Sequence, residues 1–271
     1  MTQKTKLVLT LAALSLGAFS VRGQTAATTP APAPVAPPPP TSSWTITVPY
    51  VTEYMFRGVH AGGGGIQPTV EFDSGPWAIG VWANFPVNDK IAGVSDPEID
   101  PYASYTFTLN DSTSLALGFT WYNYPNADES IGFYKSTFEP SLALNYTVGG
   151  VKFTPKIYYD VVLKGPTYEL NAAWALPLKD LGTELDFLAT LGTYKWDSAA
   201  KGASPEVKNY GDYWLLGVTV PIAITSSSKV LVGLAYTQGN NNFFKQSGSP
   251  KVENTAAVGR GVVTLGYTIT F

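Results

Sequence analysis

The chain has 271 residues, a net charge of −3, one histidine and no cysteine. The lack of cysteine excludes disulfides and thiol chemistry, and the near-neutral charge does not favour nucleic acid as a partner. Tyrosine, phenylalanine, tryptophan and glycine are abundant, with 16, 13, 7 and 26 residues, which favours strands and turns over helices.

The N-terminal segment has the pattern of a secretory signal peptide. Lys4 and Lys6 precede a largely apolar run over residues 7–19. This run is too short to span a bilayer, because a membrane helix needs about 20 apolar residues. Residues 1–23 are therefore expected to be removed on export, with cleavage after Ser20 or Gly23.

Residues 24–43 are rich in Pro, Ala and Thr, and the stretch from Pro30 to Pro40 favours an extended polyproline conformation. Such a segment cannot pack a core. We expect a periplasmic spacer, with an arm that touches the cell wall as the alternative, and we expect a membrane domain over 44–271.

From Trp44 onward, apolar residues recur at alternate positions, the pattern of a strand with one apolar face. In the last segment the apolar residues are Val263, Leu265, Tyr267, Ile269 and Phe271. In the first, the same face continues from Trp44 through Tyr54 and Phe56. The alternation predicts twelve strands, around residues 44–56, 66–72, 77–85, 99–109, 115–121, 138–146, 151–159, 168–174, 185–191, 214–222, 230–236 and 263–271.

The connections between these strands alternate in length. The longer ones cover 57–65, 86–97, 123–136, 162–167, 195–212 and 238–256, and the shorter ones 73–76, 110–112, 148–150, 178–182 and 225–228. Outer-membrane barrels have short periplasmic turns and longer external loops. The sequence therefore predicts an all-β fold, a transmembrane antiparallel up-and-down β-barrel of about twelve strands with both termini on the periplasmic side.

Aromatic residues on the apolar faces gather at both ends of the predicted strands. Such girdles are typical of barrels surrounded by lipid, because amphipathic rings settle at the headgroup level. The alternative, a soluble β-sandwich, gives no reason to sort aromatics by depth. We therefore expect outer-membrane lipid as a partner. The predicted loop-end girdle comprises Tyr54, Phe56, Phe85, Trp121, Phe138, Tyr159, Tyr168, Trp214 and Tyr236.

The opposite faces of the strands should line the lumen, and most of their charges are acidic. An acidic ring in a pore favours cations. The alternative is a closed barrel with internal salt bridges around Arg57 and Lys156. The charged residues expected to line the lumen are Glu53, Arg57, Glu71, Glu98, Asp100, Glu139, Lys156, Asp160 and Glu169.

Two motifs resemble known barrels. Tyr54-Met-Phe-Arg-Gly58, followed by Phe72-Asp-Ser-Gly75, is similar to the hallmark of the TorF-type porin family. That resemblance covers residues 52–84 and implies an outer-membrane porin without a defined substrate, with Arg57 as the motif arginine. The terminal Phe271 resembles the signal that barrel-assembly machinery binds.

Nothing in the sequence indicates an enzyme, a cofactor or a metal site. His60 is the only histidine, and it lies in the glycine-rich stretch 60–65, which we expect to be a flexible external loop. A hydrolase needs a nucleophile beside an oriented base. We therefore expect a narrow channel for passive diffusion of small hydrophilic solutes, with a preference for cations. The alternative is a closed structural or receptor barrel that acts through its external loops.

Overall fold

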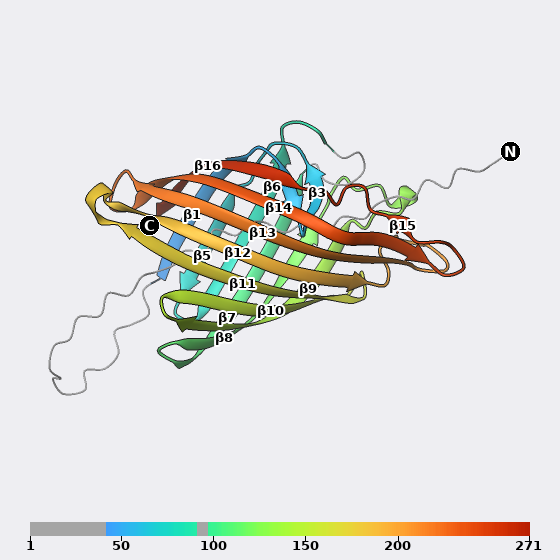
Figure 1. The fold of residues 1–271 in the computed structure, drawn as a ribbon, viewed down its shortest axis with the longest axis horizontal. Coiled ribbons are helices and arrows are strands. Elements are labelled where there is room, and N and C mark those ends of the chain that lie inside the picture. Colours follow the sequence, from blue (N-terminus) through green and yellow to red (C-terminus); the bar gives the residue numbers. More distant parts are fainter. Residues whose placement is uncertain (1–41, 91–96) are drawn as a thin grey trace.

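A computed structural model describes residues 42–90 and 97–271, and these form a closed antiparallel barrel of twelve strands (Figure 1). The predicted fold class is confirmed. The predicted signal peptide and all but the last two residues of the predicted spacer lie outside the described residues. No helix in the described ranges is both long and apolar enough to cross a membrane.

Eleven continuous strands and one interrupted strand build the wall. The first is β1 (Ser42–Val51), which begins two residues before the expected start of the barrel. The second is made of β4 (Gly65–Ile66) and β5 (Thr69–Ser74). The others are β6 (Trp77–Pro86), β7 (Glu98–Asn110), β8 (Thr113–Asn123), β9 (Ser136–Val148), β10 (Val151–Asp160), β11 (Gly165–Leu178), β12 (Thr183–Trp196), β13 (Val207–Ala223), β14 (Ser228–Gln246) and β16 (Arg260–Thr270).

Three short elements and one further hairpin complete the described chain. The hairpin consists of β2 (Tyr54–Phe56) and β3 (Val59–Gly62), which pair only with each other. The strand β15 (Val252–Glu253) pairs with β14. Two single turns of 3-10 helix lie at Glu129–Ile131 and Lys179–Leu181.

Each wall strand pairs with its neighbours along the chain, and β1 pairs with β16 to close the ring. At this seam the backbone N–H of Trp44 donates to the carbonyl of Phe271 at 3.2 Å, and the N–H of Phe271 donates to the carbonyl of Trp44 at 2.9 Å. Closure leaves no strand of the wall with an unpaired edge. An unpaired edge would expose backbone N–H and C=O groups to lipid, where no water can bind them.

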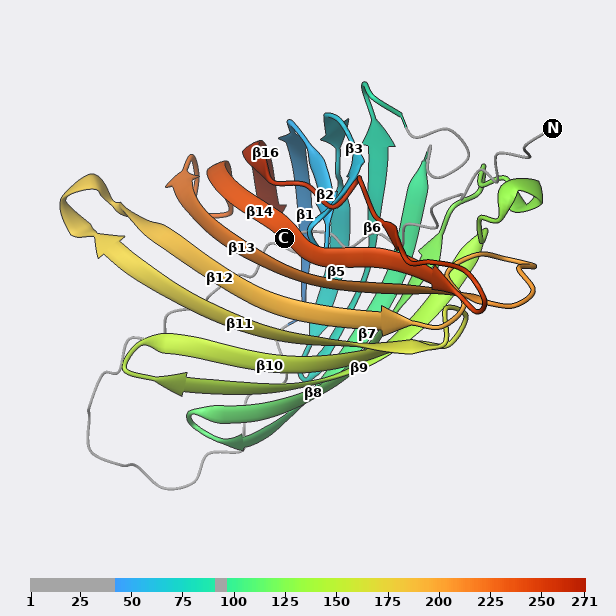
Figure 2. The same ribbon diagram turned by 45° about the vertical axis from the view of Figure 1, so that its right-hand side comes forward.

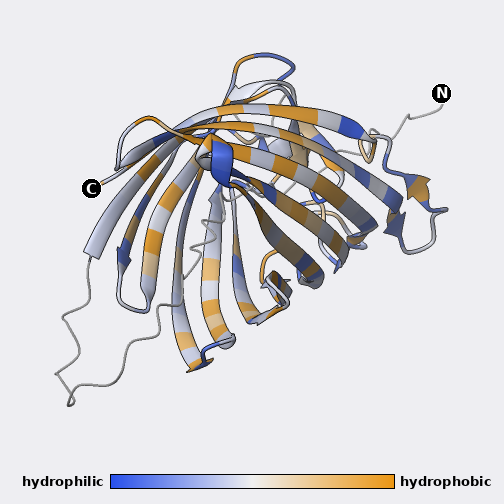
Figure 3. Ribbon diagram, turned by 60° about the vertical axis from the view of Figure 1, so that its left-hand side comes forward, coloured by the Kyte–Doolittle hydropathy of each residue, from blue (hydrophilic) through white to orange (hydrophobic). Residues whose placement is uncertain are grey.

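Apolar and polar residues alternate along the wall strands, as the orange and paler bands in Figure 3 show, and many of the large apolar side chains are exposed. Leu191, Leu216 and Leu265 expose 62%, 57% and 58% of their surface. Soluble monomers rarely expose contiguous apolar surface of this extent, and a bilayer removes it from water. Many lumen-facing positions carry polar side chains, as where the Thr47 and Thr268 hydroxyls hydrogen-bond at 3.0 Å.

The two faces of β16 give a direct test of this orientation. Leu265→Arg places a charge against lipid near the middle of the strand, so the free energy of unfolding should fall by about 2–4 kcal/mol. Thr264→Arg, one residue away, points into the lumen and should cost less. Urea unfolding of both variants in vesicles measures the difference, and equal losses would show that Leu265 does not face lipid.

Turns and loops follow the predicted alternation, but three of the predicted loops are shorter than expected. Gly149 and Gly150, both at positive φ, form the tight turn between β9 and β10. By contrast, β13 and β14 have 17 and 19 residues, so parts of the predicted loops 195–212 and 238–256 are strand (Figure 2). The predicted loop 162–167 is also shorter, because β11 begins at Gly165 and takes up half of it.

Candidate functional site

The β2–β3 hairpin leaves the wall and folds into the barrel. The prediction that Tyr54 and Phe56 continue the first strand and join the loop-end girdle is wrong, since β1 ends at Val51 and these rings are 3% and 2% exposed. Arg57 and Gly58 form the turn, with φ of 46° and 75°. Two positive φ values are typical of the type I′ turn, which matches the twist of the strands it joins.

Gly58 brings the tip of the hairpin against β13 and β14. A Cβ atom at this position would lie 2.6 Å from Gly239 Cα on β14 and 2.7 Å from Tyr213 Cβ on β13. Real Cβ atoms do not approach other atoms so closely, so both the backbone conformation and the contact require glycine.

The rest of the hairpin is anchored around the ring. The Tyr54 hydroxyl donates to Glu98 on β7 at 2.8 Å, and the rings of Phe56 and Trp196 on β12 stack at 6.5 Å. The backbone N–H of His60 donates to the carbonyl of Ala256 at 2.8 Å. The hairpin therefore spans the lumen and contacts the wall on several sides.

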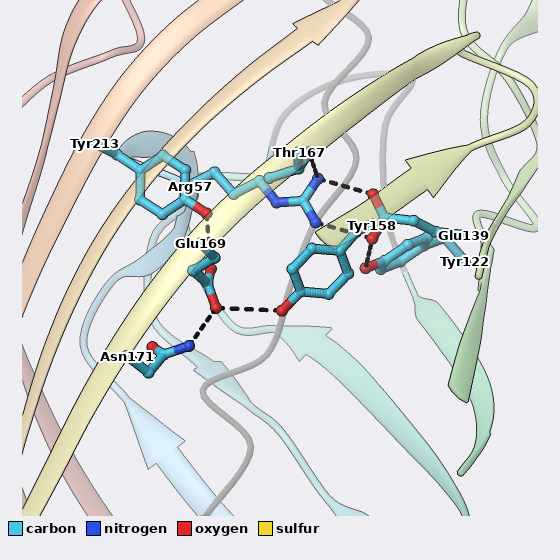
Figure 4. Close-up of polar contacts among 8 residues, drawn as sticks. All are labelled: Arg57, Tyr122, Glu139, Tyr158, Thr167, Glu169, Asn171 and Tyr213. Carbon is cyan, nitrogen blue, oxygen red and sulfur yellow. Dashed lines mark hydrogen bonds and ion pairs between the residues drawn. The ribbon is translucent and has the colours of Figure 1, made fainter. Parts of the chain in front are cut away.

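Arg57 joins the hairpin tip to two further strands (Figure 4). Its Nη1 and Nη2 donate to the two carboxylate oxygens of Glu139 on β9 at 2.9 and 2.8 Å, and Nη1 also donates to Thr167 Oγ1 on β11 at 2.8 Å. Its guanidinium carbon lies 4.9 Å from the Tyr158 ring centre and 5.6 Å from that of Trp196. A bidentate pair of this kind, enclosed by aromatic rings, fixes the tip in one place.

Tyrosine hydroxyls hold the carboxylates beside this ion pair (Figure 4). Tyr122 on β8 donates to Glu139 at 3.1 Å. Glu169 on β11 accepts from Tyr158 at 3.2 Å and from Tyr213 at 2.7 Å, and also from the Asn171 amide at 2.7 Å. The network ties β8 through β13 together around the hairpin tip.

The acids predicted to line an open ring are largely enclosed. Exposed fractions are 0% for Glu98, 2% for Asp100, 2% for Glu139 and 0% for Asp160. Asp160 accepts the backbone N–H of Val162 at 2.9 Å and of Leu163 at 2.7 Å, and Asp100 accepts that of Asn123 at 3.1 Å. These groups therefore hold the outer part of the wall and its loops together.

The remaining predicted residues lie in or beside the hairpin, on β5 and on β10. Arg57 is on the hairpin rather than on the wall, and Glu53 precedes the hairpin and hydrogen-bonds His60 at 2.8 Å. The expected flexible loop at His60 is therefore wrong, because His60 belongs to β3. Glu71 on β5 accepts from the Tyr102 hydroxyl at 2.8 Å, and Lys156 Nζ on β10 lies 4.4 Å from the Tyr158 ring centre.

A largely aromatic cluster packs around the hairpin, and its wall half consists of rings at inward positions of the strands, such as Tyr122, Tyr194 and Tyr213. The alternation of these rings along the strands is a signal from which the wall half could have been found, but no periodic signal marks the loop half. Its buried members are Tyr54, Phe56, Val59, Ala61, Trp82, Tyr122, Tyr124, Ala127, Phe133, Leu163, Tyr194, Trp196 and Tyr213. The loop-end half of the lumen is thus packed.

The external loops contact one another above this cluster. The N–H groups of Asp197 and Ser198 donate to the carbonyl of Leu163 at 3.0 and 2.9 Å, and Lys201 pairs with Glu129. Lys164 and Glu206 form an ion pair of 2.5 Å, and the hydrogen bond from Lys164 lowers the pKa of the Glu206 carboxyl.

The turn-end half of the lumen is different. Inward positions there carry small side chains that are only partly buried, among them Ala78, Ser104, Ala116, Ser141 and Ala173. An eight-stranded barrel is narrow enough for side chains to fill, and the interior widens with strand number. Small residues in a twelve-stranded wall therefore leave this half accessible to solvent, so the hairpin and its cluster separate a wider half from the loop end.

Comparisons with known proteins agree with this architecture. The solved structure of the KdgM porin is 12% identical, covers 84% of this chain and 99% of its own, and has a TM-score of 0.50. The NanC porin is 11% identical, covers 83% and 98%, and has a TM-score of 0.49. No curated protein sequence matches. The model of one family, described as "Bacterial protein of unknown function (Gcw_chp)", matches residues 36–258, and the chain belongs to that family.

Proposed function

We propose that the protein is an outer-membrane porin that lets small hydrophilic solutes diffuse passively, and that the β2–β3 hairpin sets its aperture. The observation that carries the proposal is the hairpin itself, which crosses the lumen of a closed twelve-stranded barrel. The turn-end half of the lumen is lined by small residues, and the loop-end half is packed. This arrangement favours selection of solutes by size, so we propose no catalytic role.

The outer-membrane location is part of the same proposal. The apolar exterior, the short turns and the longer loops support it, and so does the fold shared with the KdgM porin. Export by residues 1–23, assembly through Phe271 and contact of the spacer with the cell wall remain predictions. If the TorF-type resemblance holds, its motif arginine is Arg57, at the hairpin tip.

Conductance of the purified protein in planar bilayers tests the proposal. The wild-type protein should give small, stepwise currents. A variant with residues 53–63 replaced by a short Gly-Ser link should give larger steps, because the Arg57 ion pair and the aromatic packing of β2–β3 are gone. If the folded variant conducts no more than the wild type, the hairpin does not set the aperture.

The alternative function is a closed barrel that acts through its external loops. The packed aromatic cluster and the contacts among the loops favour it. A folded barrel that stays silent both with and without the hairpin would support this alternative. The preference for cations is a separate prediction, and a reversal potential that indicates anion preference would contradict it.

A further inference from the structure

Four charged side chains, from the middle of the lumen to its turn end, have no ionic partner. Lys152 and Lys156 are on β10, and Glu71 and Asp73 are on β5, all at inward positions of their strands. Within the described ranges, none of the four lies within 4.0 Å of an opposite charge, whereas Arg57 is paired. All four are partly rather than fully buried.

The lysines and the acids lie on facing walls. Following the ring from β5 to β10 takes five strand-to-strand steps through β6, and seven through β1. Within each pair, the residues differ by an even number of positions, so they point to the same face of the strand. The two lysines therefore lie on one wall of the lumen and the two acids on the facing wall.

Other inward charges weaken the separation beside Lys156 but not beside Lys152. Glu169, opposite Lys156 on the neighbouring strand, is fixed by three hydrogen bonds from neutral groups and keeps its charge, whereas Lys152 has Ala173 and Thr147 opposite it. Glu184 and Asp186 on β12 are near the turn end, as is Lys229 on β14, with only β13 between these strands. Glu184, Asp186 and Lys229 therefore place opposite charges close together on the same wall, not on walls that face each other across the lumen.

We propose that this part of the lumen selects zwitterionic solutes, those with a carboxylate at one end and an ammonium at the other. This inference rests on the proposed porin function and names its substrate class. A singly charged ion is attracted by one wall only, whereas a zwitterion that lies across the lumen is attracted at both ends. Charged walls of low dielectric concentrate a matching solute near them.

Swelling of proteoliposomes that contain the full chain tests the proposal. We compare 4-aminobutyrate, a zwitterion, with erythritol, a neutral solute of four carbons. The wild-type protein should admit the zwitterion faster. The ratio of the two rates should fall by roughly tenfold in Lys152→Met/Lys156→Met, and likewise in Glu71→Gln/Asp73→Asn. Lys195→Met, which removes an exposed lysine at the loop end of β12, should leave the ratio unchanged.

A charge swap distinguishes electrostatic selection from damage to the fold. The variant Glu71→Lys/Asp73→Lys/Lys152→Glu/Lys156→Met reverses the charges without placing a carboxylate opposite Glu169, and it should restore the ratio, since a zwitterion can turn around. An unchanged ratio in both neutralised variants, with erythritol flux intact, would overturn the inference. Absence of flux for every solute through folded wild-type protein would instead overturn the porin proposal, and the inference with it.

Discussion

Replacing Arg57 by alanine is expected to lower the free energy of unfolding by about 3–5 kcal/mol and to raise the single-channel conductance. The substitution removes the partner of Glu139, whose side chain is 1% exposed, and leaves that carboxylate charged among tyrosine rings. It also removes the contacts that hold the hairpin tip to β9 and β11. Urea unfolding and bilayer recordings of the same preparation measure both effects.

A double-mutant cycle separates the ion pair from simple packing. Arg57→Met/Glu139→Met removes both charges and should be far closer to the wild type in stability than either single variant, because no buried charge is left unpaired. Arg57→Lys keeps the charge but loses the bidentate geometry, so it should fall between wild type and alanine. Equal destabilisation by the single and double variants would show that the pair is not what fixes the tip.

Gly58→Ala is expected to displace the hairpin tip from β13 and β14. A positive φ costs an L-residue about 1–2 kcal/mol, and the overlap with Gly239 and Tyr213 should add about 1–3 kcal/mol. The overlap involves backbone atoms of β14, so a side-chain rotation cannot relieve it. Conductance should therefore rise along with the loss of stability.

Gly150→Ala is the matched control. Its φ of 79° is close to the 75° of Gly58, but a Cβ there would meet no atom within 4 Å. It should show the backbone cost alone and no change in conductance. If the two alanine variants lose the same stability and neither alters conductance, the contact between Gly58 and the wall does not hold the hairpin in place.

The wall could be predicted from the sequence because a bilayer imposes a strict alternation. Trp44, Val48 and Tyr50 must face lipid, and the same constraint recurs along every wall strand. The alternation no longer predicts strands beyond the membrane, where β13 and β14 continue through polar residues such as Asn209 and Asn242. These inward side chains are buried and the strands stay paired there, although the sequence has no alternating apolar pattern.

The hairpin could not be found by the same alternation, because Tyr54 and Phe56 continue the pattern of β1 without a break. An apolar residue buried in a plug has the same period-two signal as one that faces lipid. The dipeptide Arg57-Gly58, flanked by apolar residues at alternate positions, is a weaker hairpin signal than Asn-Gly or Asp-Gly. The partners of Arg57 are more than 80 residues away, with separations of 82 to Glu139 and 110 to Thr167, so no local pattern indicates them.

The position of the hairpin between the first two wall strands has a consequence for how the barrel matures. Every wall strand that its tip touches, from β9 to β14, follows it in the chain. The tip therefore has nothing to dock onto until most of the polypeptide has emerged, and contacts of such sequence separation form slowly. The strands that follow must therefore form the wall around the β2–β3 hairpin, which β1 and β4 already flank in the chain. The hairpin then does not have to enter a barrel that has already closed.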